Sequence, residues 1–279
     1  MLGRLDTIAT GLDHPEGVAW GPDGRVYAGG EAGQVYAISL DGAVEEIGST
    51  GGFMYGITLD GEGNVFACDF GHAEIVRMTK SGDVSSYSTG TAEHPIRVPN
   101  FTVFDEAGNL FVTDSGTWGA DDGLLLRVDA TGATEVWSDR VSGFPNGCCL
   151  SIEGDALLVV ESSRRRVVRV PIGSDGSAGA SEPIADLAGS QPDGIALAAD
   201  GTMFVGCYRP DRVWRVAPGG TPKILLDDPD GVALNQPANV AFIGADLERL
   251  AISSLGGWNI VALDVGVAGL PLRSPITRV

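Results

Sequence analysis

Six short phrases along the chain share one layout, in which a single variable side chain stands at the start of an apolar run. The first phrase is Pro15-Glu16-Gly17-Val18-Ala19. The variable position of the six phrases is occupied in turn by Glu16, Tyr55, Asn100, Asn146, Asp193 and Ala238. Four of these side chains offer carboxylate or carboxamide oxygens, a hard donor set that suits calcium first and magnesium, manganese or zinc next. The pattern predicts a divalent-cation site if the fold brings the phrases together.

The spacing of the phrases indicates how they meet. Successive equivalent positions are separated by 39, 45, 46, 47 and 45 residues, so that six units fill the chain. The first unit reads as four short strands, GVAW, RVYAGG, QVYAISL and AVEEIG, separated by turns rich in Gly and Asp. Later units repeat the same turn chemistry, and 41 glycines in 279 residues suit many tight turns.

Units of four strands at a period near 45 residues predict an all-β fold, a six-bladed β-propeller with four-stranded blades around a central channel. We expect one domain over residues 1–279, with residues 4–10 as the outer strand of the last blade. A two-domain β-sandwich also suits short strands and frequent turns, but it does not explain the even spacing. In a propeller, the six variable positions lie at one level around the axis.

Two interpretations of the variable positions compete. Asn and Asp are common turn residues, and Pro-Asn-Gly or Pro-Asp-Gly is an ordinary turn signal. However, Glu16 and Asp193 would repel each other in a confined place, and a divalent cation would balance both charges. We therefore predict Glu16, Asn100, Asn146 and Asp193 as metal ligands, with positions left open for water or substrate.

The charge of the chain limits its partners. Lys and Arg total 18 against 37 Asp and Glu, a formal charge of −19 that argues against nucleic acid and anionic membrane partners. We see no long apolar run typical of a signal peptide or a membrane span. The four cysteines form no C-x-x-C pair and suit small buried strand residues. These features predict a cytoplasmic protein that acts on a small molecule; the sequence leaves its oligomeric state open.

The sequence resembles the senescence-marker-protein/gluconolactonase family of six-bladed propellers, with diisopropyl-fluorophosphatase as a more distant relative. The resemblance lies in the phrases PEG, PN, PNG and PDG at their spacing, followed by strand phrases such as NLFVTDSG (109–116) and MFVGCY (203–208). It implies that Glu16, Asn146 and Asp193 bind a catalytic divalent metal. It also implies that Asn100 binds substrate or helps to hold the metal, and that Asp193 is the general base.

The third phrase departs from the family. The family usually reads Arg-Pro-Asn-Asp there, whereas this chain has Val98-Pro99-Asn100-Phe101 with its nearest arginine at Arg97. The change weakens any transfer of sugar-lactone specificity. We expect substrate contacts from Asn100, Arg97, Tyr55 in the ring, and Trp118 in the loop 116–123.

These observations predict a divalent-metal-dependent hydrolase, a lactonase that opens a sugar-type or related small lactone with activated water. Two alternatives stay open: a non-catalytic binding propeller stabilised by calcium, and a metal-dependent hydrolase of another ester or a phosphotriester. Other catalytic signatures, such as a G-x-S-x-G elbow, are missing from the sequence.

Overall fold

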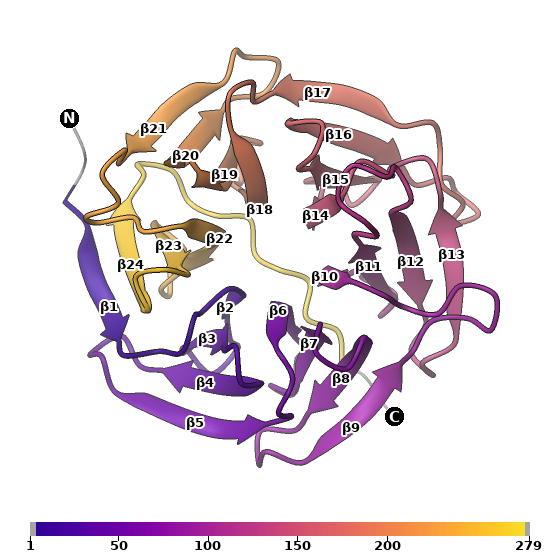
Figure 1. The fold of residues 1–279 in the computed structure, drawn as a ribbon, viewed down its shortest axis with the longest axis horizontal. Helices are drawn as coiled ribbons and strands as arrows, with labels where there is room; N and C mark the ends of the chain where they lie inside the picture. Colours follow the sequence, from indigo (N-terminus) through magenta and orange to yellow (C-terminus); the bar gives the residue numbers. More distant parts are fainter. Residues whose placement is uncertain (1–3, 277–279) are drawn as a thin grey trace.

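The computed structural model describes residues 4–276 and places them in a ring of six four-stranded antiparallel sheets (Figure 1). The predicted six-bladed β-propeller is confirmed. In each blade the strand nearest the axis carries one of the six phrases, and the following strands lie progressively further out. The variable positions of the phrases therefore lie around one end of the channel.

The first three blades follow the chain in order. Blade 1 contains β2 (Val18–Trp20), β3 (Val26–Gly29), β4 (Gln34–Ile38) and β5 (Val44–Ser49). Blade 2 contains β6 (Met54–Leu59), β7 (Val65–Asp69), β8 (Glu74–Met78) and β9 (Val84–Ser88). Blade 3 contains β10 (Pro99–Phe104), β11 (Leu110–Asp114), β12 (Leu124–Val128) and β13 (Thr134–Ser138).

The last three blades repeat this arrangement, except that blade 6 takes its outer strand from the N-terminus. Blade 4 contains β14 (Pro145–Leu150), β15 (Ala156–Glu161), β16 (Arg166–Pro171) and β17 (Glu182–Asp186). Blade 5 contains β18 (Gln191–Leu197), β19 (Met203–Arg209), β20 (Asp211–Val216) and β21 (Lys223–Asp227). Blade 6 contains β22 (Pro237–Ile243), β23 (Arg249–Ser254), β24 (Asn259–Asp264) and β1 (Asp6–Thr10).

The pairing of β1 with β24 closes the ring, as the sequence predicted for residues 4–10. The core lies between the blades rather than in one central mass. One apolar cluster, for example, joins Ile8 and Val26 to Ile260, and so connects the two ends of the chain. Joining the first and last strands in one sheet removes the exposed sheet edge that an open ring would present.

The C-terminal segment crosses the end of the channel where the inner strands finish (Figure 1). The amide of Leu270 donates to the carbonyl of Leu197 at the end of β18, and the amide of Gly61 donates to the carbonyl of Pro275. Arg273 pairs with Glu106 at 2.5 Å. The segment therefore spans the ring and covers the channel end opposite the variable positions.

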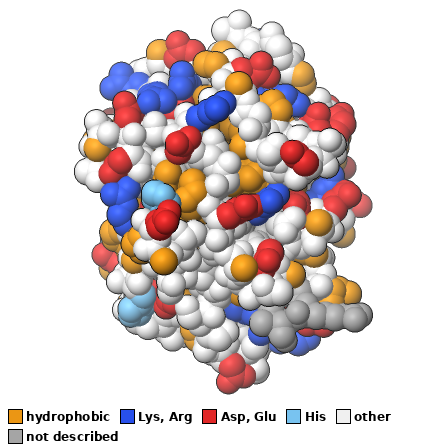
Figure 2. Space-filling view, turned by 90° about the vertical axis from the view of Figure 1, so that its right-hand side faces the viewer, with side chains coloured by type: hydrophobic (Ala, Val, Ile, Leu, Met, Phe, Trp, Pro, Cys, Tyr) orange, Lys and Arg blue, Asp and Glu red, His pale blue; other side chains and the backbone are white. Residues whose placement is uncertain are grey.

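Two simpler expectations can also be checked. All four cysteines are buried and free, which confirms their role as small strand residues. The described residues contain no helix with the length and apolarity needed to cross a membrane. On the side of the molecule seen in Figure 2, acidic and basic side chains are interspersed.

Candidate metal centre

The four predicted oxygen ligands are buried at the starts of four inner strands. Glu16 is 7% exposed, Asn100 and Asn146 are 3% exposed, and Asp193 is 6% exposed. Three of their oxygens, Asn100 Oδ1, Asn146 Oδ1 and Asp193 Oδ1, have no hydrogen-bond partner in the structure. Buried polar atoms in proteins are nearly always paired, so unpaired oxygens in this position point to a missing electrophilic partner. The donor set fits a divalent cation.

The charges of the site support the same conclusion. Burial and then the charge of Asp193 raise the pKa of Glu16 well above its ordinary value. Glu16 belongs to blade 1 and Asp193 to blade 5, so the effect of one charge on the other agrees with inner strands that converge on the axis. Burial raises the pKa of Asp193 to about 7, although a side-chain hydrogen bond from Asn146 opposes the shift. Ionisation of these two buried carboxyl groups is unfavourable without a positive charge nearby. A bound cation would balance the negative charges that they carry when ionised.

Glycines let neighbouring inner strands approach closely enough to form this site. A glycine follows the variable position in blades 1, 2, 4 and 5. A Cβ atom on Gly17 would lie 2.2 Å from the carbonyl oxygen of Tyr55, and one on Gly147 would lie 2.6 Å from that of Asp193. Both separations are too short for non-bonded atoms. The glycines of PEG and PNG are therefore required by the close packing of neighbouring inner strands.

We predict that Gly147→Ala weakens cation binding. The added methyl group would push β14 and β18 apart, and with them Asn146 and Asp193, at a cost of about 1–3 kcal/mol in unfolding free energy. Calcium titration by calorimetry should show at least about a tenfold loss of affinity, because a loss of about 1.4 kcal/mol in binding free energy lowers the affinity tenfold. Gly220→Ala is the control, because Gly220 lies in the turn between β20 and β21 and its Cβ would approach its nearest neighbour to 3.1 Å, a milder crowding than at Gly147. Unchanged calcium affinity in Gly147→Ala would contradict the prediction.

Hydroxyl groups of the second strands fix the backbone beside the ligands. Ser253 Oγ donates to the carbonyl of Glu16 at 2.5 Å, and Thr113 Oγ1 donates to that of Asn146 at 2.8 Å. Ser162 Oγ donates to the carbonyl of Pro192, next to Asp193, at 2.6 Å. Each of these three bonds joins one blade to the next. The backbone beside three of the four predicted ligands is therefore held by hydrogen bonds from the preceding blade.

The residues predicted to contact substrate occupy different places at this end of the channel. Tyr55 is half-buried and stacks on Phe70 with ring centroids 4.8 Å apart. Burial and then the charges of Glu16 and Asp193 raise the pKa of Tyr55. Asn100 and Tyr55 both stand at variable positions of the six phrases. Of the predicted substrate residues, they are therefore the two that share one end of the channel with the predicted metal ligands.

Arg97 lies just before β10, and Trp118 lies in the loop after β11. Arg97 Nη1 donates to Asp122 Oδ2 at 2.9 Å, and Nη2 donates to the carbonyl oxygen of Asp122 at 2.9 Å. Asp122 also accepts a 2.6 Å hydrogen bond from the amide of Thr117. Arg97 therefore braces the loop that carries Trp118, and its direct contact with substrate stays a prediction. Trp118 is exposed and packs on Phe144 with ring centroids 4.9 Å apart.

Asn239 is a buried polar residue that the sequence pattern did not single out. It is fully buried, and neither its Nδ2 nor its Oδ1 atom has a partner. A Cβ atom on Gly194 would lie 2.1 Å from Asn239 Oδ1. The carboxamide of Asn239 therefore lies directly beside Gly194, the residue that follows Asp193. The equivalence by proline places Ala238 at the ring position. The register of β22 between Pro237 and Val240 matches that of β14 between Pro145 and Cys148, so Asn239 occupies the position that Gly147 holds in blade 4. The phrase Pro237-Ala238-Asn239 carries an asparagine one residue later than the phrase Pro99-Asn100 does, and this was the signal from which the sequence could have identified Asn239.

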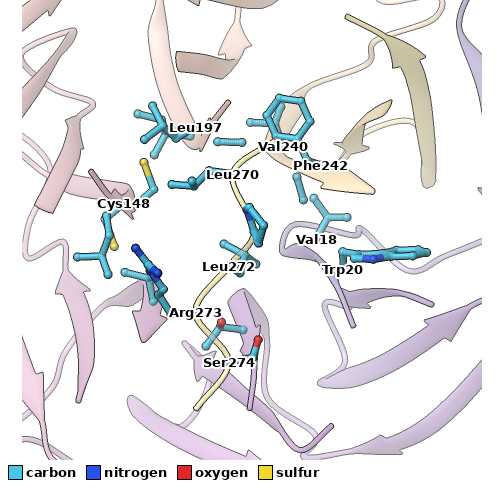
Figure 3. Close-up of a pocket in the computed structure, with 18 of the residues that line it drawn as sticks. Val18, Trp20, Cys148, Leu197, Val240, Phe242, Leu270, Leu272, Arg273 and Ser274 are labelled. Carbon is cyan, nitrogen blue, oxygen red and sulfur yellow. The ribbon is translucent and has the colours of Figure 1, made fainter. Parts of the chain in front are cut away.

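A cavity of about 180 Å³ lies in the channel beyond the ring, bounded at the far end by the C-terminal segment (Figure 3). Val18, Cys148, Leu197 and Val240 line it from the inner strands, together with Leu270. The lining residues of the inner strands follow the ring positions in sequence. The cavity is therefore an apolar chamber that separates the polar ring from the opposite face.

A second group of potential ligands lies at the rim. Suitable donor atoms of Asp13, His14 and Glu31 lie within 4.8 Å of one another, and His14 Nδ1 is 2.6 Å from Glu31 Oε2. Each of the three side chains is at least partly exposed, and the histidine already pairs with the acids. The three side chains of the rim therefore have ion-pair partners among themselves, whereas oxygens of Asn100, Asn146 and Asp193 have no hydrogen-bond partner.

Two protein-family models match parts of this chain. A family model described as SMP-30/Gluconolactonase/LRE-like region matches residues 87–256. A model described as Strictosidine synthase-like, N-terminal, matches residues 1–38. The first match covers more than half of the chain and includes Asn100, Asn146 and Asp193.

Two curated relatives match part of the chain. Protein STRICTOSIDINE SYNTHASE-LIKE 3 of Arabidopsis thaliana is 27% identical over 162 residues, which cover 53% of this chain and 41% of that protein. Adipocyte plasma membrane-associated protein of Homo sapiens is 32% identical over 122 residues, which cover 39% of this chain and 29% of that protein. The chain thus spans less than half the length of each relative.

Solved structures agree with the fold. A gluconolactonase of Xanthomonas campestris superimposes with a TM-score of 0.81 at 19% identity, over 94% of this chain and 89% of its own. Regucalcin of Agrobacterium tumefaciens, a calcium-binding protein, superimposes with a TM-score of 0.76 at 18% identity, over 99% and 97% of the two chains. At these identities the likeness establishes the propeller fold.

Proposed function

Because the chain belongs to the SMP-30/gluconolactonase/LRE-like family, we propose that it is a divalent-metal-dependent hydrolase that opens small lactones or related esters. The observation that carries the proposal is the buried ring of side-chain oxygens without hydrogen-bond partners. Glu16, Asn146 and Asp193 are the proposed ligands, and Asn100 binds the cation or orients the substrate. The names of the gluconolactonase and regucalcin neighbours support lactone chemistry and calcium, respectively.

A divalent cation bound there supplies a Lewis acid for the substrate carbonyl and lowers the pKa of water in the site. The carboxylate of Asp193 has two oxygens, so that one can hold the cation while the other accepts a proton from the attacking water. Tyr55, whose hydroxyl is kept protonated by its surroundings, can donate a hydrogen bond to the substrate. The burial of the ligands keeps bulk water away from these charges and so strengthens their interactions.

The proposal predicts that hydrolysis requires the cation. Protein stripped by a chelator should lose lactone hydrolysis, measured by proton release, and should regain it when calcium, magnesium, manganese or zinc is restored. Elemental analysis of the stripped protein provides the control. Full turnover without bound metal would contradict the proposal. Stabilisation by calcium with no hydrolysis of any lactone, ester or phosphotriester would favour a calcium-stabilised binding propeller instead.

A further inference from the structure

The exposed aromatic side chains gather at the end of the channel that carries the ring. Phe70 is 38% exposed, and Trp118 and Trp258 are each 47% exposed. Each one lies in the loop after the second strand of its blade, beyond the ends of β7, β11 and β23. Because second strands run antiparallel to inner strands, these loops share the face where the inner strands begin.

Each of these aromatic side chains contacts a residue that stands at one of the six variable positions or two residues before one. Phe70 stacks on Tyr55 with parallel planes, and Phe53 adds an edge-on contact to the same tyrosine at 4.8 Å. Trp118 packs on Phe144, two residues before Asn146. The ring of Trp258 lies 4.9 Å from that of His14, two residues before Glu16. The aromatic side chains therefore stand over the starts of the inner strands in blades 2, 4 and 1.

The charges at this face disfavour an anionic substrate. Arg97 is paired with Asp122, and Arg164 is paired with both Glu161 and Asp121 at 2.9 Å. Glu31 and Asp121 remain exposed at the rim. An anion that approached these loops would meet acidic side chains, and the guanidinium groups of Arg97 and Arg164 already have partners. Tyr208 adds a neutral hydroxyl, since burial and then the charges of Asp193 and Glu16 raise its pKa to about 12.

We propose that the substrate of this site is an uncharged lactone or ester with a flat apolar ring, which packs within the wall formed by Phe70, Trp118 and Trp258. This inference rests on the proposed function, and it specifies the substrate class. Aromatic walls bind a flat ring through buried apolar area and stacking. A polyhydroxylated lactone would instead require several hydrogen-bonding side chains, whereas Phe70, Trp118 and Trp258 offer mainly apolar ring surface.

Two measurements test the inference. The first compares kcat/KM for a phenyl-substituted lactone with that for the unsubstituted lactone and a polyhydroxylated one. We expect the wild type to prefer the phenyl-substituted lactone, and this preference to fall about tenfold in Phe70→Ala, Trp118→Ala or Trp258→Ala. Ile224→Ala is the matched control, because Ile224 is 45% exposed on β21, the outer strand of blade 5. A preference for the polyhydroxylated lactone, or no effect of all three aromatic substitutions, would overturn the inference.

The second measurement needs no turnover and so separates the inference from the proposed function. Calorimetry follows the binding of a phenyl-substituted lactam, which resists hydrolysis, to the calcium-loaded protein. We expect about tenfold tighter binding than for the unsubstituted lactam, and loss of that difference in the aromatic variants. Tight binding without hydrolysis would reject the hydrolase and keep the aromatic site. Equal binding of the two lactams would reject the aromatic site whether or not the protein hydrolyses lactones.

Discussion

Asp193→Asn is expected to reduce lactone hydrolysis by at least about 10³-fold, since a positioned general base contributes about 10² to 10⁴ and cation binding weakens as well. The substitution keeps the shape of the side chain but removes the charge and the proton-accepting oxygen. Asp193 is 6% exposed at the start of β18, so little surrounding structure should change. Initial rates at saturating calcium and substrate would measure the loss.

The control for this variant is Asp186→Asn, which removes the same charge from an exposed position at the end of β17. Circular dichroism of both variants should match the wild type. A second comparison, Asn146→Ala, separates the two roles of Asp193: raising the calcium concentration should restore activity to Asn146→Ala but not to Asp193→Asn. Turnover of Asp193→Asn within threefold of the wild type would remove Asp193 from the role of base.

The periodicity of the sequence was sufficient to predict the propeller and its closure. The phrase spacing specifies six units, and turn residues divide each unit into four strands, because both features follow from local chain geometry. The contribution of Tyr55, Asn146 and Asp193 to one end of the channel follows from that topology alone. The same logic identified residues 4–10 as the closing strand, since blade 6 otherwise contains three strands.

The details of the site depended on contacts that spacing cannot reveal. Asn239 was missed because it follows the variable position, at a place where four of the other phrases carry glycine. The engagement of Arg97 with Asp122 depends on the fold of the loop 116–123, which has no repeat to guide it. The C-terminal segment across the channel was equally invisible, since it follows the last unit and has no counterpart in other blades.

The stability of the metal-free protein should fall as pH rises from about 4 to about 7. Asp193 has a folded-state pKa of about 7 against an ordinary value of 3.8, so the folded protein binds a proton there that the unfolded chain has already released. A raised pKa in the folded state means that the stabilisation is complete below about pH 4 and lost on passing pH 7. A difference of about three between the folded and unfolded pKa values of Asp193 corresponds to about 4 kcal/mol of unfolding free energy. The pKa of Glu16 is raised as well.

Chemical denaturation of chelator-treated protein across this pH range would measure the effect, with metal-free Asp193→Asn as the reference. Asp23 and Asp155 are exposed, and hydrogen bonds and ion pairs lower their pKa values. They oppose the trend equally in both proteins and cancel in the comparison. The variant should therefore be the more stable protein at pH 7 without metal, whereas calcium should stabilise only the wild type strongly. If the two metal-free proteins lose stability in parallel, Asp193 is not confined beside Glu16 in the way that the ring requires. If the wild type alone loses stability, the buried carboxylate of Asp193 disfavours the metal-free fold and sets the pH at which cation binding begins.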